Sequence, residues 1–191
     1  MIIYLEGPDG SGKSTLADNI AELCETLKVP YNRFAEQEIS TNPTKPNRID
    51  KATLFSRLEA MSTSQKIHIL DRGPISDNIY RMFDNYEALG KLEDYLKLFK
   101  SFREKILIIY CRTAKAEEAM LARGDDNPVA IRKHKELTKA YDLIMSAILY
   151  TLPANVVKFD FTIENETTNT LKLVEHFINI QEWKNDVYDN N

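Results

Sequence analysis

The sequence predicts a three-layer, doubly wound α/β fold, in which a five-stranded parallel sheet lies between helices on both faces. Two observations support this prediction. Short apolar runs typical of buried strands alternate with segments of helical periodicity, and a glycine-rich loop joins the first run to the first helical segment. Strands that alternate with helices form right-handed crossovers, and these produce a parallel sheet covered on both faces. We expect a single domain over residues 1–191.

The elements can be assigned in order along the chain. Apolar runs predict strands at residues 2–5, 31–35, 67–70, 106–110 and 156–159. After the first run, an apolar residue recurs every three or four positions, as on the buried face of a helix: Leu16, Ile20, Leu23 and Leu27. The same spacing predicts helices around residues 75–83, 95–102, 119–122, 137–149 and 171–180. The polar tail from about residue 184 is expected to fray.

Composition limits the classes of partner. The chain carries 25 Lys and Arg against 29 Asp and Glu, for a formal net charge of −4, which argues against a nucleic-acid binder. Two cysteines, Cys24 and Cys111, form neither a disulfide framework nor a zinc cluster, and both occupy apolar positions expected to be buried. Neither a leader peptide nor a run of about 20 apolar residues is found. We therefore expect a soluble, cytoplasmic protein that does not bind membranes.

The strongest motif follows the first strand. It reads Gly7-Pro8-Asp9-Gly10-Ser11-Gly12-Lys13-Ser14, which fits the pattern G-x-x-x-x-G-K-S. Glycines let the backbone wrap an anion with its N–H groups pointing inward, and the following helix directs its positive dipole end at the same place. We expect Lys13 to reach the outer phosphates of a nucleotide and the Ser14 hydroxyl to coordinate Mg²⁺. The motif predicts a phosphate-binding loop.

A second group of polar residues follows the third strand. Asp71 and Arg72 come directly after the apolar run 67–70. A carboxylate at the carboxyl end of a strand beside the phosphate loop is placed to support Mg²⁺ or its waters. The adjoining guanidinium offers bidentate donors for a second phosphate. The alternative interpretation is an Asp that caps the next helix beside a solvated Arg.

These residues resemble those of thymidylate kinases. The run from Glu6 to Thr15 is similar to that family's phosphate loop, E-G-x-D-x-x-G-K-S/T-T, and the Asp71-Arg72-x-x-x-Ser76-x-x-x-Tyr80 segment resembles its D-R-Y-x-x-S-x-x-x-Y. Arg123-Gly124 followed by a helix with Tyr141 resembles the family's lid and the helix after it. The resemblance covers most of the chain and implies the fold of a P-loop nucleotide kinase.

The resemblance also implies roles for individual residues. ATP would bind to the phosphate loop, that is, to Gly7, Asp9, Gly10, Ser11, Gly12, Lys13, Ser14 and Thr15. Asp9 would meet the sugar 3′-hydroxyl of the acceptor nucleotide, and Arg72 would hold its phosphate. Arg57 would contribute to the acceptor pocket, and Tyr80 and Phe34 are candidates for stacking on a base. Ser14 and Asp71 would hold Mg²⁺.

The chain departs from the family pattern at three places. Gly73 stands where the family has an aromatic residue after the Asp-Arg pair. The family's R-E-P-G segment is missing, and Ala35-Glu36-Gln37-Glu38 occupies that region. The segment between Arg57 and Asp71 is also shorter than is usual in the family.

A polar segment predicts a lid at about residues 123–132. Arg123 and Arg132 flank residues 124–128, and a loop that carries arginines suits phosphoryl transfer because its closure excludes water and supplies charge. The alternative is that these arginines pair with nearby acids on a solvated face. Lys133, His134 and Lys135 are expected to form an exposed helix face.

The predicted reaction is Mg²⁺-dependent transfer of the ATP γ-phosphoryl group to a nucleoside monophosphate, dTMP or another dNMP, with Lys13, Asp71, Arg72 and Arg123 as catalytic residues. Two alternatives stay open. A deoxynucleoside kinase would need a carboxylate base near the end of the second strand, where Glu36 and Glu38 lie. A non-catalytic P-loop module would bind nucleotide only. A homodimer through the apolar helices at residues 75–102 also stays open.

Overall fold

The computed structural model describes residues 1–35, 51–83, 91–124 and 128–189. Five strands form one parallel sheet in the order β2-β3-β1-β4-β5. The strands are β1 (Ile2–Glu6), β2 (Tyr31–Ala35), β3 (Ile67–Asp71), β4 (Ile106–Cys111) and β5 (Val156–Phe159). All four pairings are parallel, and β1 at the centre pairs with β3 on one side and β4 on the other. Each strand falls where an apolar run predicts it.

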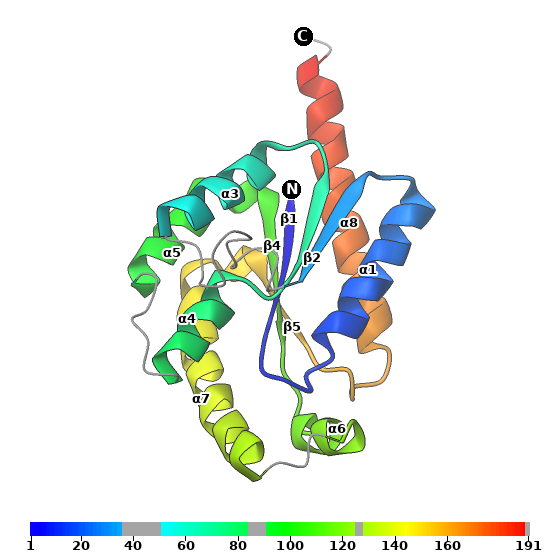
Figure 1. Ribbon diagram of the computed structural model, residues 1–191. Coiled ribbons are helices and arrows are strands. Elements are labelled where there is room, and N and C mark those ends of the chain that lie inside the picture. Colours follow the sequence, from blue (N-terminus) through cyan, green and yellow to red (C-terminus); the bar gives the residue numbers. More distant parts are fainter. Residues whose placement is uncertain (36–50, 84–90, 125–127, 190–191) are drawn as a thin grey trace, which may run out of the picture.

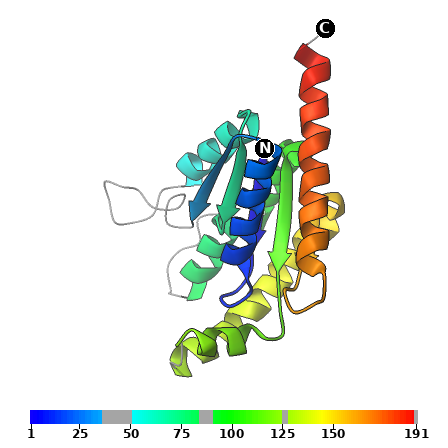
Figure 2. The ribbon, with the colours of Figure 1, turned by 90° about the vertical axis from the view of Figure 1, so that its right-hand side faces the viewer.

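Helices cover both faces of this sheet, as Figures 1 and 2 show. One face carries α1 (Lys13–Leu27) and α8 (Glu166–Asp189), and the other carries α3 (Lys51–Thr63), α4 (Pro74–Phe83), α5 (Leu92–Ser101) and α7 (Pro128–Thr151). The short α6 (Ala116–Ala122) follows β4, and single 3₁₀ turns at Arg103–Lys105 and Pro153–Asn155 lead into β4 and β5. The predicted doubly wound, three-layer fold is therefore confirmed.

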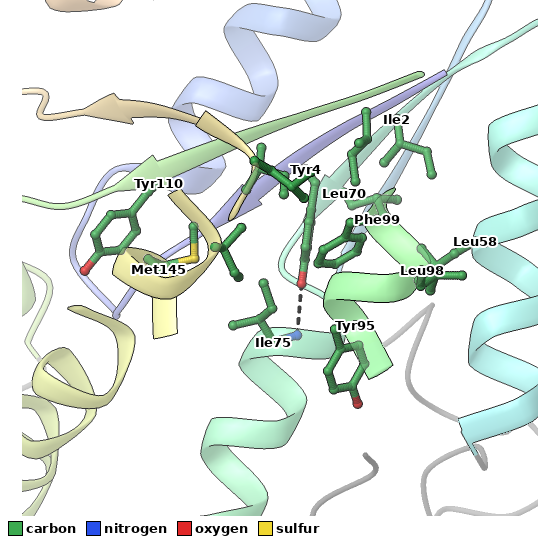
Figure 3. Close-up of a cluster of buried hydrophobic side chains, with 14 of the residues drawn as sticks. Ile2, Tyr4, Leu58, Leu70, Ile75, Tyr95, Leu98, Phe99, Tyr110 and Met145 are labelled. Carbon is green, nitrogen blue, oxygen red and sulfur yellow. Dashed lines mark hydrogen bonds between the residues drawn. The ribbon is translucent and has the colours of Figure 1, made fainter. Parts of the chain in front are cut away.

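The sheet separates two apolar cores. Alternate residues of each strand point to opposite faces, so Ile3 and Leu5 pack toward α1 and α8 whereas Ile2 and Tyr4 pack toward the other helices. Figure 3 shows the second core, where Tyr4 lies beside Leu70 and Phe99. The thiols of Cys24 and Cys111 are free and buried, as predicted.

The C-terminal helix is longer than its periodicity indicates. α8 continues to Asp189 and extends beyond the sheet (Figure 2). Residues 184–189 of the tail that is expected to fray belong to this helix. No Gly or Pro interrupts the sequence between Glu166 and Asp189, so nothing in the backbone chemistry ends the helix earlier. Among the described residues, no helix combines the length and apolarity that a membrane span requires.

Candidate functional site

The phosphate loop lies between β1 and α1, packed against the carboxyl end of β4. Gly7 adopts a φ of +149°, and a β-carbon at this position would lie 2.1 Å from the Cys111 carbonyl oxygen. No side chain can be accommodated at that distance, so glycine is needed here for the loop to leave β1 and reach the start of α1.

Lys13 is folded back over the loop. Its Nζ donates to the Pro8 carbonyl at 2.6 Å and lies 3.2 Å from the Ser11 hydroxyl. The side chain is buried, and burial, followed by the charge of Arg72, lowers the pKa of Lys13 to about 8. No side chain caps the N-terminus of α1 and no acidic residue lies in its first turn. This end of the helix therefore suits an anionic ligand.

A cavity of about 290 Å³ opens over the loop. It brings together most of the residues singled out from the sequence: Asp9, Gly10, Ser11, Gly12, Lys13, Ser14, Thr15, Asp71, Arg72 and Arg123. Asp71 and Arg72 reach this place because β3 pairs with β1 in a register that sets Leu5 opposite Asp71. The cavity thus combines three cationic side chains with two carboxylates at the carboxyl ends of parallel strands.

Asp9, Arg72 and Tyr80 form one connected group at the edge of this cavity. The Arg72 guanidinium forms a salt bridge with the Asp9 carboxylate and donates to the Tyr80 hydroxyl at 2.7 Å, and that hydroxyl donates to Asp9 Oδ2 at 2.9 Å. Burial alone would raise the pKa of Asp9, but Arg72 and the Tyr80 hydroxyl outweigh it and hold this pKa below its ordinary value. The group fixes the direction of the arginine.

The backbone of Arg72 is also unusual. Its φ is +74°, in the left-handed region that non-glycine residues rarely adopt. Its N–H donates to the Leu5 carbonyl at 3.0 Å, so the conformation is held by the end of β1. Such strained residues often occur at functional sites, where the surrounding structure maintains them.

Buried polar groups of β1 anchor the start of α4, just after Arg72. Glu6 is fully buried, and its carboxylate accepts hydrogen bonds from the Tyr4 hydroxyl, the Ser76 hydroxyl and the Ser76 N–H. The Tyr4 hydroxyl accepts in turn from the Ile75 N–H at 3.0 Å (Figure 3). Burial raises the pKa of Glu6, while these hydrogen bonds act in the opposite direction. β1 thereby satisfies backbone donors in the first turn of α4.

Tyr4 also explains the glycine after the Asp-Arg pair. A β-carbon on Gly73 would lie 2.9 Å from the Tyr4 ring, which is itself fully buried. The aromatic residue expected by resemblance at position 73 would collide with this ring. In this chain the aromatic side chain in that space comes from β1.

Some sequence-based assignments are not brought into the cavity. Arg57 lies on α3, and it is not among the residues that line this cavity. Phe34 is partly buried and stacks on His68, with ring centroids 5.9 Å apart, so its ring faces the core. Glu36 and Glu38 lie outside the described residues.

The predicted lid at residues 123–132 includes the first residues of a helix. Residues 125–127 lie outside the described part of the chain, and α7 already begins at Pro128, so residues 128–132 are helical. Proline at the first helical position favours this earlier start. Arg123, at the end of α6, does line the cavity.

The prediction that His134 lies on an exposed helix face is wrong. His134 is only 7% exposed, and its Nε2 lies 2.9 Å from the backbone carbonyl oxygen of Asp9. The lysines on either side of it suggest a solvated face from the sequence, but α7 crosses the phosphate loop at this residue. Its burial depends on a contact between residues 125 positions apart.

A second cavity of about 250 Å³ adjoins the first and shares Gly10, Gly12, Thr15 and Arg123 with it. Its apolar lining includes Ala119, Phe159 and Phe161, and Phe161 is 40% exposed. Sequence reasoning missed these residues. Phe161, two positions beyond the end of β5, could have indicated this part of the site, because ligands of open α/β sheets bind outside the carboxyl ends of the strands.

Ser14 and Asp71 are the residues that could hold a divalent cation. Both line the first cavity, and hydroxyl and carboxylate oxygens are ligands that Mg²⁺ prefers. Among the described residues, no group of three or more His, Cys, Asp or Glu could hold a metal. The donor set therefore fits a cation that is bound together with substrate phosphates rather than in an all-protein site.

Solved structures share this fold. One is the YorR protein from Bacillus subtilis in complex with phosphorylated GDP, with a TM-score of 0.65 and 20% identity over 95% of this chain and 98% of that one. Another is deoxyadenosine kinase from M. mycoides with the products dCMP and dCDP, with a TM-score of 0.52 and 20% identity over 94% and 98% of the two chains. The same kinase with dATP gives 0.51 and 18% identity over 94% and 99%.

No protein-family model and no curated protein matches the sequence. At the identities of the solved structures, similarity establishes the fold alone, and that fold is one used by a deoxynucleoside kinase. Membership of the thymidylate kinase family, which the sequence motifs suggest, stays a prediction.

Proposed function

We propose that this protein is an ATP-dependent nucleotide kinase that transfers the γ-phosphoryl group of ATP to a nucleoside monophosphate, dTMP or another dNMP. One observation carries the proposal: Arg72, directed by Asp9 and Tyr80, lines the same cavity as Lys13 and Arg123. Lys13 belongs to a loop suited to the donor phosphates, and Arg72 follows directly after β3, the strand that pairs with β1. Two separately anchored cations suit a reaction between two anions.

The donor side would use the phosphate loop and the adjoining cavity. The N–H groups at the start of α1 and the Lys13 ammonium would bind the ATP phosphates. The apolar lining of the second cavity, with Phe161 at its edge, suits a base. The M. mycoides kinase of the same fold binds dATP, which is in keeping with a nucleotide donor here.

Ser14 and Asp71 would hold Mg²⁺, which when bound neutralises charge on the phosphates. An oxygen of the acceptor phosphate attacks the γ-phosphorus of ATP, the bond to the bridging oxygen breaks, and ADP leaves with that electron pair. The attacking oxygen is already ionised, so no general base is required. Arg72 would orient the acceptor phosphate, and Arg123 would offset charge on the transferred group.

A deoxynucleoside kinase is the second candidate, because deoxyadenosine kinase shares the fold. Such an enzyme must remove a proton from a neutral 5′-hydroxyl and so needs a carboxylate base. The carboxylates that the sequence offers for this step are Glu36 and Glu38, near the end of β2, and both lie outside the described residues.

A coupled ADP-release assay with ATP and Mg²⁺ against all common nucleosides and nucleoside monophosphates tests the proposal. We expect turnover with at least one deoxynucleoside monophosphate and its loss in Lys13→Ala, with the variant remaining folded by circular dichroism. Turnover with nucleosides only would favour the second candidate. ATP binding without turnover on any acceptor would favour a non-catalytic binding module.

A further inference from the structure

Asp9 is held from three directions, and only two of them involve its side chain. The carboxylate contacts Arg72 and Tyr80, as described above. The backbone carbonyl of the same residue lies 2.9 Å from Nε2 of His134. Because a carbonyl oxygen can only accept, Nε2 is the donor and carries the ring proton. His134 therefore holds the main chain of Asp9 in place, and with it the position of the Asp9 carboxylate.

His134 belongs to α7, the helix whose first residues fall within the predicted lid. It lies in the second turn of α7, which begins at Pro128. The next residue, Lys135, forms a 3.3 Å ion pair with Glu117 of α6. Figure 1 shows α6 and the N-terminal part of α7 at the end of the molecule where the loop between β1 and α1 lies. α7 is therefore tied to the phosphate loop through His134 and to α6 through Lys135.

The imidazole itself is not placed to react. His134 is buried, and it is not among the residues that line the cavity over the phosphate loop. Its contact is with the main chain, whereas Asp9, to which it bonds, does line that cavity. We therefore expect His134 to act on the reaction through Asp9 rather than by contact with a substrate.

We propose that His134 is a positioning residue for the acceptor end of the site. By donating from Nε2 to the Asp9 carbonyl, it holds the Asp9 carboxylate where it can direct Arg72, and it connects α7 to that group. This inference rests on the proposed function for its kinetic consequences. The hydrogen bond itself is independent of which substrate the enzyme uses.

Three substitutions test the geometry. Gln can place an amide N–H near the position of the imidazole Nε2, whereas Asn, with the same amide on a shorter side chain, reaches only near Nδ1. Leu removes the donor and keeps the apolar bulk. We expect His134→Asn and His134→Leu to raise the acceptor KM about tenfold, with little change in ATP affinity measured without acceptor. His134→Gln should restore most of the loss.

His176→Leu is the matched control, because this histidine is exposed on α8. It should leave the acceptor KM unchanged. Equal acceptor KM values in the wild type and in the Gln, Asn and Leu variants at position 134 would overturn the proposal. A loss of ATP affinity as large as the loss for the acceptor would also overturn it, since that would indicate a general disruption of the loop.

A second measurement does not depend on activity. The ¹⁵N spectrum of the histidine rings, assigned with His134→Gln, reports which ring nitrogen carries the proton. We expect His134 to be in the Nε2–H form, and an Nδ1–H form would overturn the proposal because Nε2 could then not donate. If the wild type phosphorylates no acceptor, the proposed function fails, and this spectrum still decides whether the hydrogen bond exists.

Discussion

The buried ammonium of Lys13 makes nucleotide binding depend on pH in a direction that follows from the structure. Burial, followed by the charge of Arg72, lowers the pKa of Lys13 from 10.5 to about 8. That difference makes the charged form about 3 kcal/mol less favourable in the folded protein than in the unfolded chain. Between pH 8 and pH 10.5 the unfolded chain retains a proton that the folded protein has lost. Without nucleotide, this group therefore makes the free energy of unfolding rise with pH in that window.

Bound ATP favours the charged form of Lys13, because the ATP phosphates stabilise the ammonium. Above pH 8, binding must take up a proton at Lys13, and ATP affinity should fall by up to about tenfold for each pH unit. Below pH 8 the lysine is already charged, and its contribution to the pH dependence disappears. The affinity for ATP should fall with pH both with and without magnesium, since the pH dependence arises from Lys13 of the protein.

Isothermal titration calorimetry of ATP binding without acceptor, from about pH 7 to about pH 9.5, measures this dependence. Two buffers of different ionisation enthalpy at each pH give the number of protons taken up. Lys13→Met is the matched control, and it should bind ATP more weakly with no proton uptake above pH 8. An unchanged wild-type affinity across this range, or the same slope in the Met variant, would refute the reasoning.

Three further predictions concern the acceptor end of the site. Arg72→Lys should raise the acceptor KM about 10- to 100-fold and lower kcat, because a lysine cannot replace the bidentate donors of an arginine. Calorimetry should show that the ATP affinity without acceptor is unchanged. A 2′,3′-dideoxy acceptor should have a KM about tenfold above that of its 2′-deoxy counterpart in the wild type, and this difference should vanish in Asp9→Ala; equal use of both acceptors by the wild type would exclude a contact with the 3′-hydroxyl. Gly73→Ala should lower the free energy of unfolding in urea by about 1–3 kcal/mol, because its β-carbon meets the buried Tyr4 ring, and an unchanged value would show that the ring can move.

The fold could be predicted from the sequence because its signals are local. Each strand is a short apolar run and most helices have an apolar stripe of period 3.6, so segments such as 2–5 and 106–110 can be identified without knowledge of their neighbours. α3 (Lys51–Thr63) is the exception, because its apolar residues form only a weak stripe and their spacing does not predict it. The phosphate loop is also local, since its glycines and Lys13 lie within one short stretch, residues 7–13. These parts need no information on long-range pairing.

The rest of the site depends on register and on crossing helices. Asp9 and Arg72 are 63 residues apart, and they meet because Leu5 of β1 is paired with Asp71 of β3. Nothing in the sequence specifies that register by itself. The burial of His134 depends likewise on where α7 crosses the loop, and its charged neighbours suggest the opposite. The need for glycine at position 73 depends on Tyr4 of β1, whose ring fills the space beside it.

The central claim, that the acceptor is a nucleoside monophosphate, can be tested by direct competition. The protein is given equal concentrations of a deoxynucleoside and its monophosphate with Mg²⁺ and a limiting amount of ATP, for each of the four common bases, and the products are followed by ³¹P NMR. For at least one base, we expect the coupled doublets of a new nucleoside diphosphate and no increase in the monophosphate signal. Growth of the monophosphate signal at the expense of the deoxynucleoside, with no diphosphate other than ADP for any base, would contradict it.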